Sequence, residues 1–199
     1  EVAKNIPLIL IDRYFDNTSL PYVCTDNYSG GYLAAEHLMN KGYRNLLAIQ
    51  GVPTSMPNKE RRRGFSQAVA DYAHRGVRAR VAGDSFSVEN GYREAVAALT
   101  SDDRPDAVFV FSTTILLGVI KATKELQLRI PEDVAVISFD NNRFLDYIDP
   151  AITRVEQPVN TIGKLATDNI VRMIENEGER VVITPQILVR PALIEGRSC

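Results

Sequence analysis

The chain has 199 residues, of which 45% are hydrophobic and 24% charged, a composition typical of folded globular proteins and not of disordered ones. Its 23 basic and 25 acidic side chains give a net charge of −2, so it lacks the overall positive charge of a self-sufficient nucleic-acid binder. Cys24 and Cys199 lie far apart and outside any CxxC pattern, which argues against a zinc site or disulfide scaffold and favours a cytoplasmic location. No apolar stretch approaches the ~20 residues of a membrane span, so no membrane contact is expected.

Apolar runs of strand length alternate with segments of helical period. The first half of the chain predicts a strand at Leu8–Ile11, a helix from Asp26 to Gly42, a strand at Leu46–Ile49 and a helix containing Phe65–Tyr72. The rest of the chain predicts strands at Val77–Val81, Ala107–Phe111 and Val134–Phe139 and helices at Val88–Leu99, Ile115–Leu126 and Thr161 to Glu177. Several strands are apolar throughout, as strands covered on both faces are. The alternation indicates an α/β fold with a mainly parallel, doubly wound sheet.

Two of the predicted strands end on a carboxylate. Asp12 follows "LILI", and Asp140 follows "AVISF" at the start of the polar segment "DNNRFLDYIDP". In doubly wound sheets, ligands bind beyond the carboxyl ends of the strands. Either acid alone is equally well explained as a helix or turn cap. Together they favour a binding site, because an unpaired buried charge is costly.

Patterns typical of catalysis are absent from the sequence. It contains no GxGxxG, GxxxxGK[ST], HExxH or GxSxG. His37 and His74 both lie within helical patterns, with no serine or cysteine nucleophile at a strand end beside them. Asp140 with Asp146 or Asp149 lacks the spacing of a cation-binding loop. We therefore expect no enzyme, no cofactor and no metal site.

Polar and aromatic residues nevertheless gather in the loops that follow the strands. They are Asp12, Arg61, Phe86, Ser112, Thr113 and Asp140. Carboxylates accept hydrogen bonds from vicinal hydroxyls, a guanidinium donates to ring or phosphate oxygens, and an aromatic face covers the apolar side of a sugar. The run "KERRRGF", Lys59 to Phe65, has two readings: a solvated helix face, or one arginine pointing into a cleft.

Five segments in unbroken order carry a family resemblance. They are "VCTDNYSGGYLAAEHLMNKGYRNLLAIQG", "RRRGFSQAV", "GDSFSVENGYREAVAAL", "LRIPEDVAVISFDN" and "PAITRVEQPVNTIGKLA". Together they resemble the effector-binding core of the LacI/GalR family of bacterial transcription repressors over essentially the whole chain. The resemblance implies two α/β subdomains of the type I periplasmic-binding-protein fold, joined by three crossovers, with an effector in the cleft between them.

The resemblance also implies roles for single residues. Asp12 looks like the acid of the first subdomain that touches sugar hydroxyls, and Asp140 like the acid of the family's turn after a strand. Arg61, three residues before the Gly64-Phe65 pair, looks like the effector-anchoring arginine. Phe86 falls where an aromatic stacks on the ligand, although "GDSFS" is one residue longer than the usual spacing.

One departure from the family bears on the effector. Ser112 and Thr113 in "FSTTILLG" stand where the family usually has Asn-Asp. Their shorter hydroxyls leave more room, so a larger or differently oxidised effector is expected. A similar replacement in the fructose-repressor branch hints at a sugar phosphate, with which Arg61 to Arg63 are compatible.

The resemblance divides the chain into four parts. Residues 1–24 and 157–184 are expected to form an incomplete first subdomain, whereas 25–156 and 185–199 form a nearly complete second one. The family's DNA-binding headpiece, hinge helix and early strands of the first subdomain have no counterpart. We expect an exposed apolar patch where their cover is missing, over Leu8–Ile11 and the Ile162–Met173 face.

These features predict the effector-binding and dimerisation region of a LacI-type regulator. Its expected partners are a small sugar or sugar phosphate, a second copy of the chain, and operator DNA through a headpiece outside this sequence. The twofold contact is expected on the helix after Ser112, including Leu117, and on the elbow Phe144–Ile148. The alternatives are a periplasmic sugar-binding protein of a transport system and an enzyme on the same fold.

Overall fold

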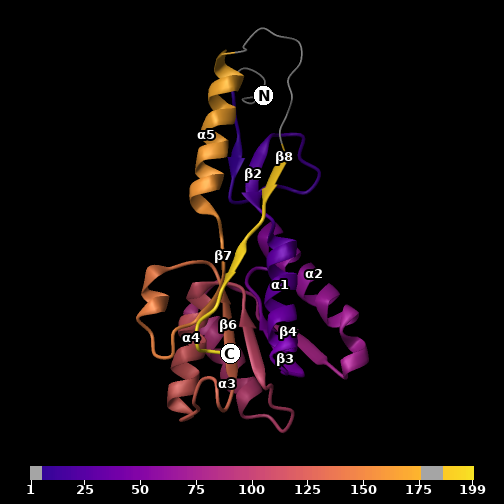
Figure 1. Cartoon of the computed structure of the whole chain (residues 1–199), viewed down its shortest axis with the longest axis vertical. Helices are drawn as coiled ribbons and strands as arrows, with labels where there is room; N and C mark the ends of the chain where they lie inside the picture. The colour runs from indigo at the N-terminus through magenta and orange to yellow at the C-terminus, as the bar shows by residue number, and fades with distance from the viewer. Residues whose placement is uncertain (1–5, 176–185) are drawn as a thin grey trace. The chain divides into compact units, whose positions relative to one another are not determined.

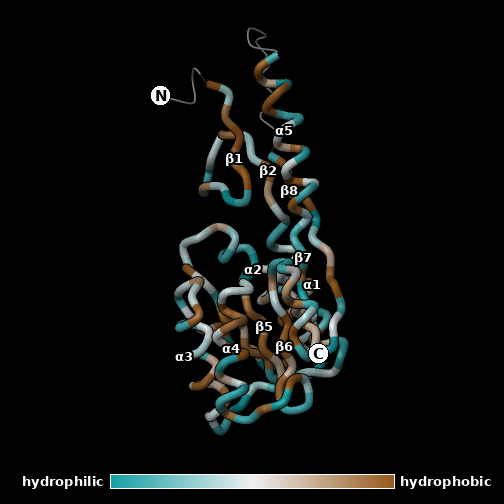
Figure 2. The backbone as a smooth tube through the Cα atoms, turned by 90° about the vertical axis from the view of Figure 1, so that its left-hand side faces the viewer, coloured by the Kyte–Doolittle hydropathy of each residue, from teal (hydrophilic) through white to brown (hydrophobic). Residues whose placement is uncertain are grey.

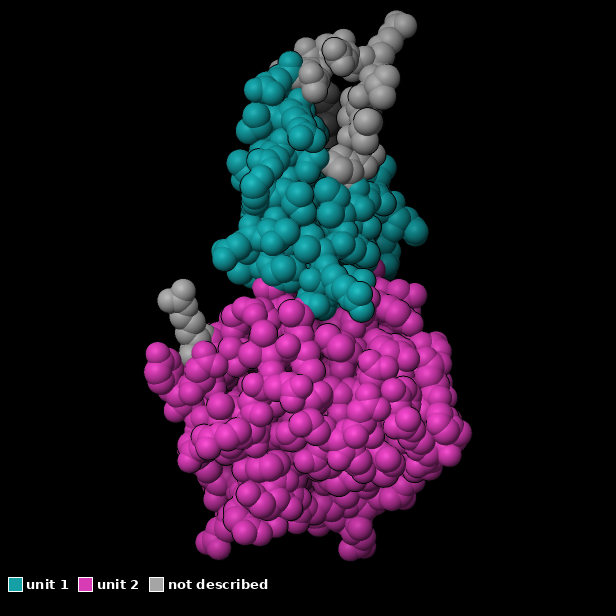
Figure 3. All heavy atoms as spheres, viewed as in Figure 1, with its two compact units in different colours: residues 1–26, 158–191 teal, residues 27–157, 192–199 magenta. Residues whose placement is uncertain are grey.

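The computed structural model describes residues 6–175 and 186–199 of the chain. The chain divides into two compact units, which are coloured separately in Figure 3. Unit 1 comprises Glu1–Asp26 and Pro158–Pro191, and unit 2 comprises Asn27–Gln157 and Ala192–Cys199. No helix in the described ranges is long and apolar enough to cross a membrane.

The sheet of unit 2 has six strands in the order β4-β3-β5-β6-β7-β9. Their bounds are β3 Asn45–Ile49, β4 Arg78–Ala82, β5 Ala107–Val110, β6 Ala135–Phe139, β7 Thr153–Glu156 and β9 Ala192–Ile194. The first five run parallel, and β9 pairs antiparallel with β7. This confirms the predicted doubly wound, mainly parallel sheet. Strands β3, β5 and β6 lie in its centre and are almost entirely buried. Figure 2 shows the hydrophobic character of β5 and β6.

Four helices cover the two faces of this sheet. They are α1 Asn27–Asn40, α2 Met56–Asp71, α3 Val88–Leu99 and α4 Thr113–Glu125, with short 3-10 turns at Ala73–Arg75 and Arg143–Asp146. Helices α1 and α2 lie on one side and α3 and α4 on the other (Figure 1). Ser87 caps α3, as predicted: its hydroxyl accepts a hydrogen bond from the backbone N–H of Asn90.

Glycines set the distance between the helices of each pair. A Cβ atom on Gly64 of α2 would lie 2.0 Å from the carbonyl oxygen of Tyr28 in α1. In the other pair, a Cβ atom on Gly118 of α4 would lie 2.1 Å from the carbonyl oxygen of Val88 in α3. No side chain fits at these contacts, so the backbones approach directly. Both pairs are thereby held with their amino-terminal turns beside the carboxyl ends of the strands.

Unit 1 has a parallel sheet in the order β1-β2-β8, with bounds β1 Leu10–Ile11, β2 Tyr22–Thr25 and β8 Gln186–Val189. Helix α5, Val159–Glu175, packs against β1 and β2. The predicted end of this helix at Glu177 lies outside the described residues. The pairing of β8 with β2 places the return to unit 2 at Ala192, whereas the sequence-based division placed it at residue 185.

The apolar core of unit 1 is small. Val23, Ile162 and Ala166 form its buried cluster among the described residues. Several large apolar side chains of this unit are exposed: Ile6, Leu8, Ile11, Phe15, Val159, Val171, Ile174 and Leu188. Leu8 and Ile11 belong to the predicted patch and are exposed, but the predicted helix face is not: Ile162 and Ala166 are buried against the sheet, and the exposed residues of α5 lie elsewhere on the helix. The exposed set fits a unit that buries little apolar surface by itself.

The close helix contacts give a stability prediction. We expect Gly118→Ala to destabilise the protein by about 2 kcal/mol or more, because the added methyl group meets the backbone of α3. Gly163→Ala in α5 is the matched control, since nothing lies within 4 Å of its Cβ position, and it should stabilise by about 0.5–1 kcal/mol. Urea unfolding monitored by circular dichroism measures both changes. Equal effects of the two substitutions would contradict the close-approach account.

Candidate functional site

Arg61 places a guanidinium group inside unit 2, at the carboxyl edge of the sheet. The residue is only 4% exposed. Its Nε donates to Asn27 Oδ1 at 2.8 Å, and its Nη1 donates to the carbonyl oxygen of Phe111. Its Cζ lies 3.6 Å from the centroid of the Phe139 ring, a cation–π contact. Of the three arginines in the basic run, Arg61 is therefore the one that points inward.

Asp140 faces this guanidinium. Its Oδ1 lies 3.7 Å from Arg61 Nη2, and it also accepts a hydrogen bond from the side-chain amide of Gln157. Its backbone φ is +82°, in the left-handed region that side-chain-bearing residues rarely adopt. Backbone strain of this kind gathers at binding sites, where it aims a side chain. The structure thus brings together two of the predicted site residues, Arg61 and Asp140.

Ser112 and Thr113 follow β5 and begin α4. The Ser112 hydroxyl caps this helix by accepting a hydrogen bond from the backbone N–H of Ile115 at 3.3 Å. The neighbouring Thr113 Oγ1 is buried, and no described atom hydrogen-bonds to it. A buried hydroxyl without a partner carries an energetic cost, which a ligand oxygen or nitrogen would remove. Thr113 and Ser112 stay predicted ligand contacts, and the structure shows that Ser112 caps α4.

Phe86 lies in the loop between β4 and α3. Its ring packs directly on Gly51, at the end of β3: a Cβ atom on Gly51 would lie 2.3 Å from the ring carbons. The phenylalanine is only partly buried, so part of it remains available to a ligand. The contact with Gly51 links Phe86 to the carboxyl edge of the sheet.

Asp12 belongs to unit 1, where it directly follows β1. Its φ is +67°, the same left-handed region as Asp140, and Arg13 Nε lies 3.2 Å from its Oδ2. Its side chain is 58% exposed. Burial raises the pKa of the nearby Cys24 thiol to about 12, and the negative charge of Asp12 adds to this shift. Asp12 stays a predicted effector contact.

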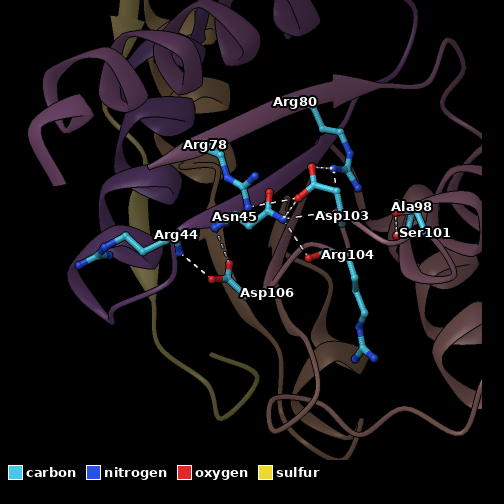
Figure 4. Close-up of polar contacts among 9 residues, drawn as sticks. All are labelled: Arg44, Asn45, Arg78, Arg80, Ala98, Ser101, Asp103, Arg104 and Asp106. Carbon is cyan, nitrogen blue, oxygen red and sulfur yellow. Dashed lines mark hydrogen bonds and ion pairs between the residues drawn. The ribbon is translucent and has the colours of Figure 1, made fainter. Parts of the chain in front are cut away.

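The opposite, amino edge of the unit 2 sheet has a different character (Figure 4). The Asp106 carboxylate accepts hydrogen bonds from the backbone N–H groups of Arg44 and Asn45, at 2.7 and 3.0 Å. Asp103 lies 3.2 Å from an Arg78 nitrogen and 3.1 Å from an Arg80 nitrogen. The acids and arginines form ion pairs with each other, and Asp106 binds the backbone at the start of β3, so we assign them a structural role.

Sequence reasoning missed two polar members of the site. Asn27 was placed only within the helix predicted from Asp26 to Gly42, yet its side chain accepts a hydrogen bond from Arg61. Gln157 was assigned only to the boundary between subdomains, yet it binds Asp140. The available signal was position: Asn27 follows β2 closely and Gln157 directly follows β7, so both lie just beyond the ends of strands.

Neither histidine forms part of this site. Burial lowers the pKa of His37, and its Nε2 has no hydrogen-bond partner within the described part of the chain. His74 lies in an exposed 3-10 turn. Within residues 6–175 and 186–199, no group of three or more His, Cys, Asp and Glu side chains is placed to hold a metal ion.

Comparisons with known proteins identify the family. The sequence model of the periplasmic binding protein-like domain matches residues 35–199. The repressors from Serratia proteamaculans and Erwinia tasmaniensis, both named HTH-type transcriptional repressor PurR, are 36% and 34% identical to this chain over its whole length. The chain spans 58% of the length of each of these relatives. It therefore belongs to the periplasmic binding protein-like domain family.

Solved structures agree on the fold. A LacI family transcriptional regulator from Mycobacterium smegmatis is 22% identical with a TM-score of 0.86, covering 100% of this chain and 72% of that one. A LacI family regulator from Enterococcus faecium with bound ribose is 24% identical with a TM-score of 0.84, covering 96% and 70%. The predicted resemblance to the effector-binding region of LacI-type repressors is confirmed. The named sequence relatives are repressors and not enzymes, and the absence of catalysis stays a prediction.

The buried guanidinium gives a second stability prediction. We expect Arg61→Leu to destabilise the protein by about 3 kcal/mol, because it leaves the Phe111 carbonyl oxygen unpaired and removes the positive charge facing Asp140. Arg63→Leu on the same helix is the control: that side chain is 65% exposed, so its loss should change stability by less than about 1 kcal/mol. Urea unfolding measures both. If the two variants were equally stable, the inward role of Arg61 would be wrong.

Proposed function

We propose that this chain binds a sugar or sugar phosphate at the carboxyl edge of the unit 2 sheet, and that this binding controls the DNA affinity of a LacI-type regulator. The observation that carries the proposal is the contact of Arg61 with Asp140 there. It places a hydrogen-bond donor, the guanidinium, beside an acceptor, the carboxylate. Two neighbouring sugar hydroxyls, or a ring oxygen and the hydroxyl next to it, can bind such a pair. Thr113 adds a buried hydroxyl with no partner among the described residues, and Phe86 adds an aromatic face.

Regulation would follow from differential binding. A ligand that binds one arrangement of the regulator more tightly than the other shifts the equilibrium between them. Couplings of this kind are typically ~1–3 kcal/mol, enough for a tenfold-scale change in operator affinity. Because this chain has a net charge of −2, we propose that operator DNA is contacted by a headpiece outside it. A cytoplasmic location follows from that role.

The alternative of a periplasmic sugar-binding protein shares the fold. The sequence relatives reported above are repressors by name, and this favours the regulator. An enzyme on the same fold would need a nucleophile or a general base at the site. Arg61, Asp140 and Thr113 instead form a set suited to holding a ligand without reacting with it.

A ligand screen tests the effector class. We expect one of ribose, ribose 5-phosphate and fructose 1-phosphate to raise the melting temperature, whereas adenine and hypoxanthine should not, because a ligand that binds the native state stabilises it. Ribose is included because the Enterococcus faecium regulator of the same fold contains it. A shift confined to the purines would overturn the sugar assignment.

The same screen, followed by titration calorimetry, tests the role of Asp140. Asp140→Asn should weaken binding of the active compound by about tenfold or more, since hydrogen bonds to a charged group contribute ~1.5–3 kcal/mol. Asp149→Asn is the control, because its carboxylate is 89% exposed and pairs with Arg197. Equal affinities of the two variants would remove Asp140 from the site.

We further propose that unit 2 carries the surface of a homodimer. Leu117 on α4 is 41% exposed and Tyr147 in the elbow is 88% exposed. Large apolar side chains with this much exposure often mark a protein–protein contact surface. Tyr147 also lines a groove of about 670 Å³ between the elbow and the second half of α4. The apolar lining residues of this groove include Ile120, Leu128, Ile130, Ile148 and Ile152.

Sedimentation velocity tests this surface. The wild-type protein is expected to sediment as a dimer, and Leu117→Asp as a monomer, because a buried carboxylate at a twofold contact is unpaired. Val52→Asp is the control, since Val52 has a similar exposure of 42% but lies in the loop after β3. Dissociation by both substitutions, or by neither, would contradict the assignment.

A further inference from the structure

Asn90 is a buried asparagine whose side chain fastens the loop between β4 and α3. The residue is 1% exposed. Its Nδ2 donates to two carbonyl oxygens, that of Gln50 at 3.0 Å and that of Ser85 at 2.6 Å. Its Oδ1 accepts from the backbone N–H of Asp84 at 3.2 Å. One side chain thus holds two residues of the loop and the end of strand β3.

These bonds enclose Phe86. The side chain of Asn90 binds the residue before it, Ser85, and the backbone N–H of Asn90 binds the hydroxyl of the residue after it, Ser87. The asparagine side chain is long enough to reach back across the loop to Ser85. Both flanks of Phe86 are therefore fixed to one residue on the first turn of α3.

The ring of Phe86 is fixed from a second direction. It lies against Gly51, where a Cβ atom would come within 2.3 Å of the ring carbons. Gly51 is itself held, because its backbone N–H donates to the buried Asn58 side chain at 2.8 Å. Asn58 in turn donates to the side chain of Gln50 at 3.1 Å. Gln50 therefore connects the two supports of the ring. Its side chain binds Asn58, which holds Gly51, and its carbonyl oxygen binds Asn90, which holds the loop of Phe86.

We infer that Asn90 is the positioning residue for Phe86: it holds the aromatic ring against Gly51 in the orientation in which it covers the ligand. The inference rests on the proposed function. An aromatic ring ordered before binding loses less conformational entropy when the ligand arrives, so its preorganisation contributes to affinity. Asn90 donates both amide hydrogens to backbone carbonyl oxygens, so it has none left for the ligand. It acts on binding by positioning the Phe86 ring.

Fluorine NMR tests the positioning without a ligand. In protein labelled with fluorophenylalanine, Phe86→Leu identifies the Phe86 signal among those of the 7 phenylalanines. Asn90→Ala should shift or broaden this signal. Asn90→Asp, which keeps the size and the acceptor but loses both donated bonds, should do so as well and serves if the alanine variant does not fold. Asn45→Ala is the matched control, because it removes an amide with bonds to Asp103 and Arg104 at the other edge of the sheet. An unchanged Phe86 signal in the Asn90 variants would overturn the inference.

A double-mutant cycle tests the consequence for binding, with ribose, ribose 5-phosphate and fructose 1-phosphate as probes. Asn90→Ala should weaken the probe that binds by about tenfold, and it should have little further effect in a Phe86→Leu background, because the two residues act through one ring. The control Asn45→Ala should leave affinity unchanged. An equal loss in both backgrounds, or no loss, overturns this inference while the proposed function stands. If no probe binds the wild-type protein, the proposed sugar-binding function and the inference that rests on it both fail.

Discussion

The buried guanidinium of Arg61 organises the carboxyl edge of unit 2. Removing a guanidinium from water costs several kcal/mol unless hydrogen bonds and a counter-charge replace the lost hydration. Arg61 obtains them from Asn27 at the start of α1, from the carbonyl oxygen of Phe111 after β5, and from Asp140 after β6. Each partner belongs to a different element, so the charge fixes their ends relative to one another. A ligand that binds here meets groups already held in place.

The helix pairs bring these ends together. Direct backbone contacts at Gly31 and Gly64 hold α1 against α2, and contacts at Gly91 and Gly118 hold α3 against α4. The first pair carries Asn27 and Arg61, and the second begins beside Phe86 and Thr113. The same packing that closes the core therefore also determines where the polar groups lie. The two sheet edges differ accordingly. The amino edge has acids and arginines that pair with each other, whereas at the carboxyl edge the buried Thr113 hydroxyl has no hydrogen-bond partner among the described residues.

Much of the unit 2 fold could be predicted because its central strands are apolar throughout and its helices have clear apolar periods. Strands β3, β5 and β6 were predicted within one residue at each end. Strands β2 and β7 were not, because "YVCT" and "TRVE" are short and mixed in polarity. Their strand character also depends on pairing with β8 and β9, which lie much later in the chain. The boundary near residue 185 depended on the same information, since only the pairing of β8 with β2 shows where that strand belongs.

The site was predicted less completely than the fold. The acids after strands could be found from the chain alone, but composition could not decide which of Arg61, Arg62 and Arg63 points inward; the family resemblance selected Arg61, and the structure buries it. Asn27 and Gln157 were missed because a single amide carries no pattern, and its role depends on a partner distant in sequence. The left-handed backbone of Asp140 could not be predicted either, since it occurs where its N–H donates to the carbonyl oxygen of Val155 on another strand.

The central claim is that Arg61 and Asp140 together hold a polyhydroxylated ligand. The most direct measurement is a crystal structure of the protein with the sugar or sugar phosphate that stabilises it. The account predicts sugar oxygens within hydrogen-bonding distance of the Asp140 carboxylate and the Arg61 guanidinium, with the Phe86 ring against the apolar face of the sugar. A ligand found elsewhere, with Arg61 and Asp140 contacting only the protein, would contradict it.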